Sequence, residues 1–172
     1  MTAAAPARAL AALALLAACG GPTPPAPPPV PVEGPRAEVR LLAGSWAGEF
    51  VNLPAGRRGT IVFTLDAGRD TAHAWVVTEG APPPAGCTDA VSSAVRAPAD
   101  GRTVLRLGRV VVDAGSIAGW LESYRDFELG CPVDTWFEGR LVRDTLRGMF
   151  FAHPEAGDTV RRGTWWAARQ RR

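Results

Sequence analysis

The chain contains few side chains suited to acid–base or nucleophilic chemistry near neutral pH. Histidine is the residue that most readily changes its charge there, and the sequence has two, His73 and His153. Neither stands in a motif such as Gly-x-Ser-x-Gly or His-Glu-x-x-His, which would supply a nucleophile or a metal-bound water. A histidine on a strand is more often a surface or packed residue than a general base. We therefore do not expect an enzyme; a site built from scattered residues is the least favoured alternative.

A second group of polar residues consists of the acidic side chains near Cys131, namely Asp126, Glu128 and Asp134. Carboxylate oxygens bind hard cations, but an acidic loop is usually only solvated. With two histidines and no Cys-x-x-Cys spacing, the chain lacks the ligand sets typical of zinc. We expect neither a metal nor a cofactor.

Residues 1–18 have the composition of an export signal. Arg8 is their only charge, and the apolar run at 9–18 is about half as long as a bilayer-spanning helix. The run ends in Leu-Ala-Ala-Cys at residues 16–19. This segment resembles the lipobox of bacterial lipoproteins, which implies cleavage before Cys19 and attachment of acyl chains, palmitate among them, to that residue. The alternatives are an ordinary secretory signal and a buried amino-terminal helix.

The lipobox resemblance implies a protein anchored in the cell envelope, because two or more acyl chains bind a membrane stably. Gly20 stands where an aspartate would favour retention in the inner membrane, which indicates the outer membrane if the cell has one. Residues 19–37 are rich in proline. Such a sequence favours extended polyproline II, so we predict a lipidated cysteine followed by a semi-rigid linker.

Cys87 and Cys131 are the two cysteines that remain if Cys19 is acylated. An even number of cysteines in an exported domain indicates a disulfide. We therefore predict a Cys87–Cys131 bond. Free thiols and metal ligation are the alternatives.

Residues 38–172 have the pattern of an all-β domain. Between 135 and 169, apolar and polar residues alternate in three segments typical of an antiparallel meander. Gly139, Gly148 and Gly163 lie inside these segments, where a sheet bends or a large side chain crosses the backbone. Further strand candidates are 41–51, 59–65, 72–78, 91–96, 103–112 and 117–124, with loops at 80–89 and 126–134. We predict a small antiparallel up-and-down barrel of about eight strands, because closure removes unpaired edges.

Two residues at the ends of this pattern suggest how the barrel closes. Trp46 follows Gly44-Ser45 on the first strand, and Arg169 ends the last strand. This arrangement resembles the Gly-x-Trp motif of the calycin group, the lipocalins and avidins, in which an arginine packs over the tryptophan. The resemblance implies an eight-stranded barrel, often with a ligand cavity, and a structural role for Trp46 and Arg169. The chain departs from the group in having no clear carboxy-terminal helix and none of the loop motifs of the animal lipocalins.

Aromatic residues are the candidates for a ligand site. Alternation leaves the facing of a strand uncertain by one register step. We predict that five aromatic residues face the interior: Phe63, Trp75, Trp120, Phe137 and Phe150. The formal net charge of +2 gives no electrostatic signature of nucleic-acid binding.

We therefore expect an envelope-anchored lipoprotein whose lipocalin-like barrel binds a small apolar or amphipathic ligand. The alternative is a protein-interaction or inhibitor lipoprotein that acts through its loops and has a packed barrel. The interior volume of the barrel distinguishes the two, because eight strands leave either a filled core or room for one small ligand.

Overall fold

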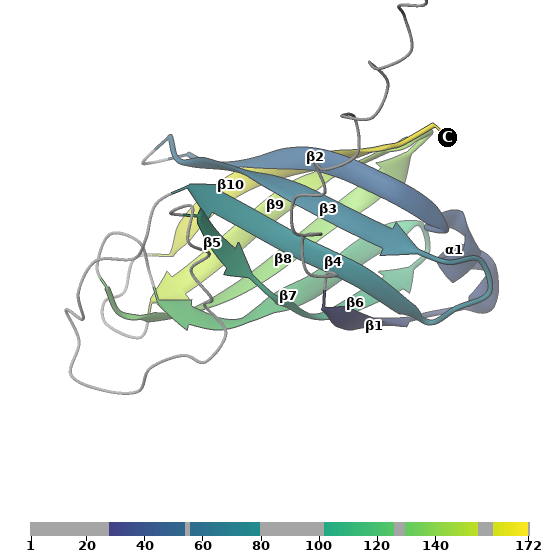
Figure 1. The fold of residues 1–172 in the computed structure, drawn as a ribbon, viewed down its shortest axis with the longest axis horizontal. Helices are drawn as coiled ribbons and strands as arrows, with labels where there is room; N and C mark the ends of the chain where they lie inside the picture. The colour runs from purple at the N-terminus through teal and green to yellow at the C-terminus, as the bar shows by residue number, and fades with distance from the viewer. Residues whose placement is uncertain (1–27, 54–55, 80–101, 126–129, 155–159, 172) are drawn as a thin grey trace, which may run out of the picture.

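Nine strands close into a barrel in the computed structural model, which describes residues 28–53, 56–79, 102–125, 130–154 and 160–171. The elements are β1 (Pro29–Glu33), α1 (Arg36–Leu41), β2 (Gly44–Asn52), β3 (Arg58–Leu65), β4 (Thr71–Glu79), β5 (Arg102–Leu105), β6 (Leu107–Asp113), β7 (Ser116–Arg125), β8 (Pro132–Val142), β9 (Thr145–Pro154) and β10 (Arg161–Arg169). The ring runs β1-β6-β7-β8-β9-β10-β2-β3-β4 and closes where β4 pairs with β1 (Figure 1). The predicted all-β barrel is confirmed.

The prediction of a purely antiparallel barrel of eight strands was wrong because of β1. This strand lies inside the expected linker, and it pairs with β4 in the antiparallel sense and with β6 in the parallel sense. Its side chains alternate, with Val30 and Val32 buried in the core and Pro29, Pro31 and Glu33 exposed. Proline lacks a backbone N–H, but the valines between the prolines keep theirs, and Val32 N–H donates to Asp70 O at 2.7 Å. Hydrophobic burial at alternate positions thus makes a strand of a Pro-rich segment.

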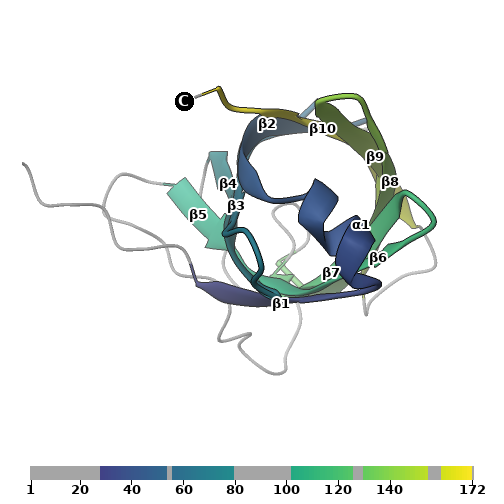
Figure 2. The same ribbon diagram turned by 90° about the vertical axis from the view of Figure 1, so that its right-hand side faces the viewer.

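A break in the expected strand 103–112 makes room for β1. The chain divides at Arg106 into β5, which pairs with β4, and β6, which pairs with β7 and has a register shift between Leu107 and Arg109. As a result, β5 and β1 both pair with β4, at different parts of that strand. Figure 2 shows β5 at the side of the ring and β1 across the gap below it.

The predicted meander is confirmed, and it closes on the first predicted strand. Strands β8, β9 and β10 pair in sequence, and β10 pairs with β2 from Gly163 opposite Asn52 to Arg169 opposite Trp46. The expected irregular segment 126–134 is shorter than predicted, since β8 begins at Pro132. The predicted loop at 80–89 and the weak strand at 91–96 lie outside the described residues.

One end of the barrel is closed by α1, a six-residue helix that sequence periodicity did not reveal (Figure 2). Val39 in the helix and Leu42 just after it are buried. They meet a core that includes Trp46, Leu65 and Val30. Six residues are too few to display a helical repeat, which explains why the helix was not predicted.

Candidate functional site

The barrel interior contains a cavity of about 100 Å³ that is partly open to the outside. Its wall is almost entirely apolar, with aliphatic side chains on β3 to β7, β9 and β10 and five aromatic ones from β2, β3, β8, β9 and β10: Phe50, Phe63, Phe137, Phe150 and Trp165. Leu146 and Ala167 line the cavity towards the α1 end, and Thr135 is the one hydroxyl-bearing residue in its lining, although no polar atom faces the space. The cavity is therefore a place for an apolar group.

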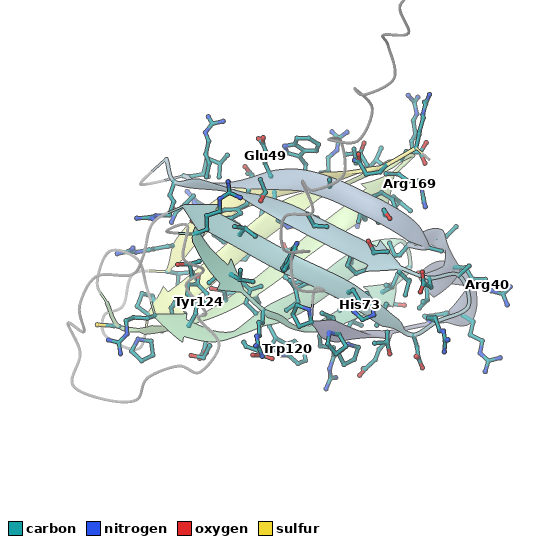
Figure 3. The ribbon with its side chains drawn as sticks, in the orientation of Figure 1. Arg40, Glu49, His73, Trp120, Tyr124 and Arg169 are labelled. Carbon is teal, nitrogen blue, oxygen red and sulfur yellow. The ribbon has the colours of Figure 1, made fainter. Side chains whose placement is uncertain are left out.

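Three of the five predicted interior residues line this cavity: Phe63, Phe137 and Phe150. The facing predicted for the other two was wrong. In β4 the buried positions are those of Ala72, Ala74, Val76 and Thr78, which puts Trp75 on the outer face. In β7, Trp120 is 43% exposed and points away from the barrel (Figure 3).

Trp75 and Trp120 face outward because the inner face of the barrel needs small residues beside the rings that already lie there. Each of four inward rings lies against a glycine of another strand: Phe50 against Gly59, Phe137 against Gly119, Trp165 against Gly139 two strands away, and Phe150 against Gly163. The predicted reason for Gly139 and Gly163, a large side chain crossing the backbone, is confirmed; at Gly148 the close neighbour is the backbone of β8. Residues Phe50 and Trp165 were missed, and the glycines opposite them were the available signal.

The rings also hold one another. Phe50 and Phe150 meet edge to face at 5.8 Å between centroids, and Phe137 and Trp165 do so at 5.7 Å. The Trp165 Nε1–H donates to Met149 O at 3.1 Å and to Glu138 O at 3.2 Å. This indole is thus fixed against the wall, with its only polar atom already bonded.

Polar groups gather at the barrel end opposite α1. Thr78 and Thr103 are buried and lie opposite each other on β4 and β5. The hydroxyls of Tyr124 and Thr135 are 3.0 Å apart and buried, and Figure 3 shows Tyr124 at the end away from Arg40 of α1. On β2, Asn52 has a buried Oδ1 with no hydrogen-bond partner among the described residues. The interior therefore changes from apolar to hydroxyl-bearing along the barrel axis.

Trp46 and Arg169 meet at the α1 end. Trp46 is fully buried, and its Nε1–H donates to Leu42 O at 2.8 Å. The guanidinium of Arg169 lies 4.2 Å from the ring centroid of Trp46. It also donates to Leu41 O at 2.7 Å and to Ala43 O, both carbonyls at the end of α1. The pair therefore fastens the helix to the sheet.

Gly44 of the Gly-x-Trp motif has a backbone reason to be glycine. Its φ is +115°, a conformation that L residues rarely adopt. A Cβ at this position would also come within 3.2 Å of a guanidinium nitrogen of Arg169. The motif therefore belongs to the same joint as Trp46 and Arg169.

The structure does not bring the chemistry-bearing residues together. His73 is on the outer face of β4, and His153 is exposed on β9 opposite Asp134. No group of three potential metal ligands occurs among the described residues. Asp126 and Glu128 lie outside the described part of the chain.

The two predicted modifications fall largely outside the described residues. Cys131 is buried, at 4% exposed, but Cys87 and Cys19 belong to segments that are not described. The Cys87–Cys131 pairing and the acylation of Cys19 therefore stay predictions. Within the described segments, no helix is long and apolar enough to cross a membrane.

No family model, curated protein or solved structure matches this chain significantly. The resemblance to the calycin group therefore stays a prediction from the sequence, while the closed mixed barrel is an observation.

Proposed function

We propose that this protein is an envelope lipoprotein, anchored through Cys19, whose barrel binds a small apolar or amphipathic ligand. The observation that carries the proposal is the apolar cavity with polar groups gathered at one end of the barrel. An engineered cavity of about 150 Å³ in another protein is large enough for benzene, so a space of about 100 Å³ suits a single small ring or a short alkyl chain.

The arrangement of the interior gives the ligand an orientation. Because α1 covers one end, the apolar part would lie among Phe63, Phe137 and Phe150, and any polar part would point to the opposite end. There it would meet the Tyr124–Thr135 hydroxyl pair. A donor group could also satisfy the unpartnered Oδ1 of Asn52, since leaving a buried acceptor unpaired costs about 1–3 kcal/mol.

The ligand proposal is tested with a panel of benzene, toluene and 1-hexanol. A ligand that binds only the folded protein stabilises it by about 2.7 kcal/mol at a hundredfold excess over Kd, which raises the melting temperature. The variant Ala74→Leu fills the cavity beside Phe63, because Ala74 is buried and lines it. We expect this variant to weaken binding by about tenfold or more, the loss that a displaced methylene or two produces.

The matched control is Ala118→Leu, which adds the same side chain on the exposed face of β7. It should leave binding unchanged. Equal binding by wild type and Ala74→Leu, or no stabilisation by any member of the panel, contradicts the ligand proposal and favours a packed barrel that acts through its surface.

The anchor is tested separately by mass spectrometry of the amino-terminal peptide. We expect a peptide that begins at Cys19 and carries acyl chains, and a Cys19→Ala protein that leaves the membrane fraction. An unmodified Cys19 contradicts the anchor without affecting the ligand proposal.

The disulfide is expected because export exposes the domain to an oxidising compartment. Peptide mapping without reduction should find the peptides of Cys87 and Cys131 joined. Free alkylation of both thiols in the unfolded, unreduced protein would show that the pairing is wrong.

A further inference from the structure

A row of aromatic side chains crosses the outer face of the barrel. On adjacent strands Trp120, Trp136 and Phe151 lie directly opposite one another, and an arginine follows at each end, Arg109 on β6 and Arg162 on β10. We call these five residues the outer row. Trp120 is 43% exposed and Trp136 is 42% exposed. Large rings at this exposure, side by side, form the kind of patch that marks an interaction site.

The rings of the outer row are held in place within the chain. Trp136 and Phe151 are stacked, with centroids 5.4 Å apart and 19° between the ring planes. The Arg109 guanidinium lies 4.7 Å from the ring centroid of Trp120. Neighbours therefore cover one face of Trp120, Trp136 and Phe151, which reduces the ring surface left for flat stacking on a sugar or a base. Rings that are already ordered within the chain lose little side-chain freedom on contact with a protein surface, which favours that kind of partner.

The charges around the outer row are of both signs. Four arginines and four carboxylates lie around the three rings on β2 and β6 to β10, the two arginines of the row included: Arg109, Arg140, Arg147, Arg162, Glu49, Glu122, Asp134 and Glu138. Of these eight residues, Arg109 is the one with an ion pair to a described residue, namely Glu33 at 3.2 Å. A balanced rim gives little attraction for nucleic acid or an anionic membrane, which need an excess of positive charge.

One pair on the rim lacks a counterion. Arg140 and Arg147 lie directly opposite each other on β8 and β9, and both are exposed. Like charges directly opposite each other on a sheet destabilise it, and a carboxylate from a partner would remove this repulsion. The chain itself presents exposed carboxylates beside the same row, Glu138 and Asp134. A second copy of the chain thus supplies the carboxylates that the Arg140–Arg147 pair lacks.

We propose that a second copy of this chain covers the outer row, giving a two-fold symmetric dimer through the outer faces of β7, β8 and β9. A symmetric interface must be complementary to itself, and this wall combines an aromatic centre with a rim of both charges. Tryptophan and arginine are also the residues most enriched at binding hot spots. The proposal is independent of the ligand function, since it uses the opposite face of the wall.

The size of the wall limits the affinity. From β6 to β10 it spans about 20 Å, and along β8 from Asp134 to Arg140 it spans about another 20 Å. The flat area of this wall is roughly 400 Å², without the extra surface that protruding side chains add. It is below the roughly 800 Å² that each partner buries in a stable complex. We therefore expect a dimer with a Kd in the micromolar range, which tethering to one membrane would favour.

The test is sedimentation equilibrium of the chain carrying Cys19→Ser, so that no acyl chain drives association, from about 1 to 200 µM. We expect a monomer–dimer equilibrium. The variants Trp136→Ala and Trp120→Ala should each weaken it about 30-fold, the loss typical of a hot-spot residue. Arg140→Glu should weaken it, because a carboxylate of the partner would then face a carboxylate in place of a guanidinium, and added salt should reduce this difference.

Trp75→Ala is the matched control, since Trp75 lies on the outer face of β4, away from the row. It should leave the dimer unchanged, and melting temperatures identify any variant that fails to fold. A wild-type chain that stays monomeric at about 200 µM overturns the proposal, as does a dimer that Trp136→Ala and Trp120→Ala leave intact. Vesicles of phosphatidylglycerol and of phosphatidylcholine form a second arm. Binding to them by a chain that does not self-associate would assign the outer row to a membrane and also overturn the dimer.

Discussion

Aromatic side chains occupy both faces of the barrel wall, and the two faces hold them differently. Inside, Phe150 leans on Gly163 and Phe137 on Gly119, so each ring fits a space that the same chain provides. Outside, Trp136 stacks on Phe151 and remains 42% exposed. The inner rings therefore stabilise the barrel and shape its cavity. The outer rings contribute little to folding and are free to serve an interface.

This difference predicts that truncating a tryptophan lowers the free energy of unfolding more when the side chain faces the interior than when it faces outward. Trp46→Ala should destabilise the protein by about 3–5 kcal/mol, as removal of a buried aromatic does, because Trp46 is fully buried and bonded to Leu42 O. Urea unfolding provides the free energy. Trp46→Phe, which keeps a ring below Arg169, should lose less, and equal stability of the alanine variant and wild type would contradict the role of Trp46 in closing the barrel.

Substitutions at the glycines beside the inner and outer rings should also destabilise the protein to different degrees, by less than Trp46→Ala does. A Cβ at Gly163 would collide with the ring of Phe150 and with the backbone of Val51, neither of which can move freely. Gly163→Ala should therefore cost about 1–3 kcal/mol, the range for overpacking. The three atoms nearest to a Cβ at Gly108 all belong to the exposed side chain of Trp120. Gly108→Ala should cost less than about 1 kcal/mol, and the reverse order in urea unfolding would show that the rings are not packed differently on the two faces.

The smallest effect is expected for the outer row. Trp136→Ala should change the free energy of unfolding of the monomer by less than about 1 kcal/mol, because the side chain is exposed and only its stacking on Phe151 is lost. The measurement is urea unfolding at a protein concentration below the dimer Kd. A loss as large as that of Trp46→Ala would mean that the outer rings are structural and not reserved for a partner.

The sequence was informative where alternation was strong and uninformative where two faces looked alike. The meander of β8, β9 and β10 could be predicted because polar and apolar residues alternate over its whole length. Facing could not be predicted in β4, where Trp75 alternates with the small residues Ala74 and Val76. In β7 a signal did exist, because Gly119 makes room for Phe137 and thus marks the inner face.

The other differences arise from tertiary contacts that no local pattern encodes. Strand β1 was assigned to the linker because of its prolines, yet Val30 and Val32 fill the gap between β4 and β6. The polar end of the interior is also invisible in the sequence, since Tyr124 and Thr135 come together across a register shift in β7. Both features depend on how the sheet closes.

Ligand binding inside the barrel requires that the inner rings leave a usable space. The most direct measurement is a crystal structure of the protein with the tightest binder among benzene, toluene and 1-hexanol. We predict electron density for the ligand between Phe63, Phe137 and Phe150, with the hydroxyl of 1-hexanol directed towards the Tyr124–Thr135 pair. An empty interior with rings closed across the axis, or a ligand bound only on the outer wall, would contradict the proposal that the barrel binds a ligand inside.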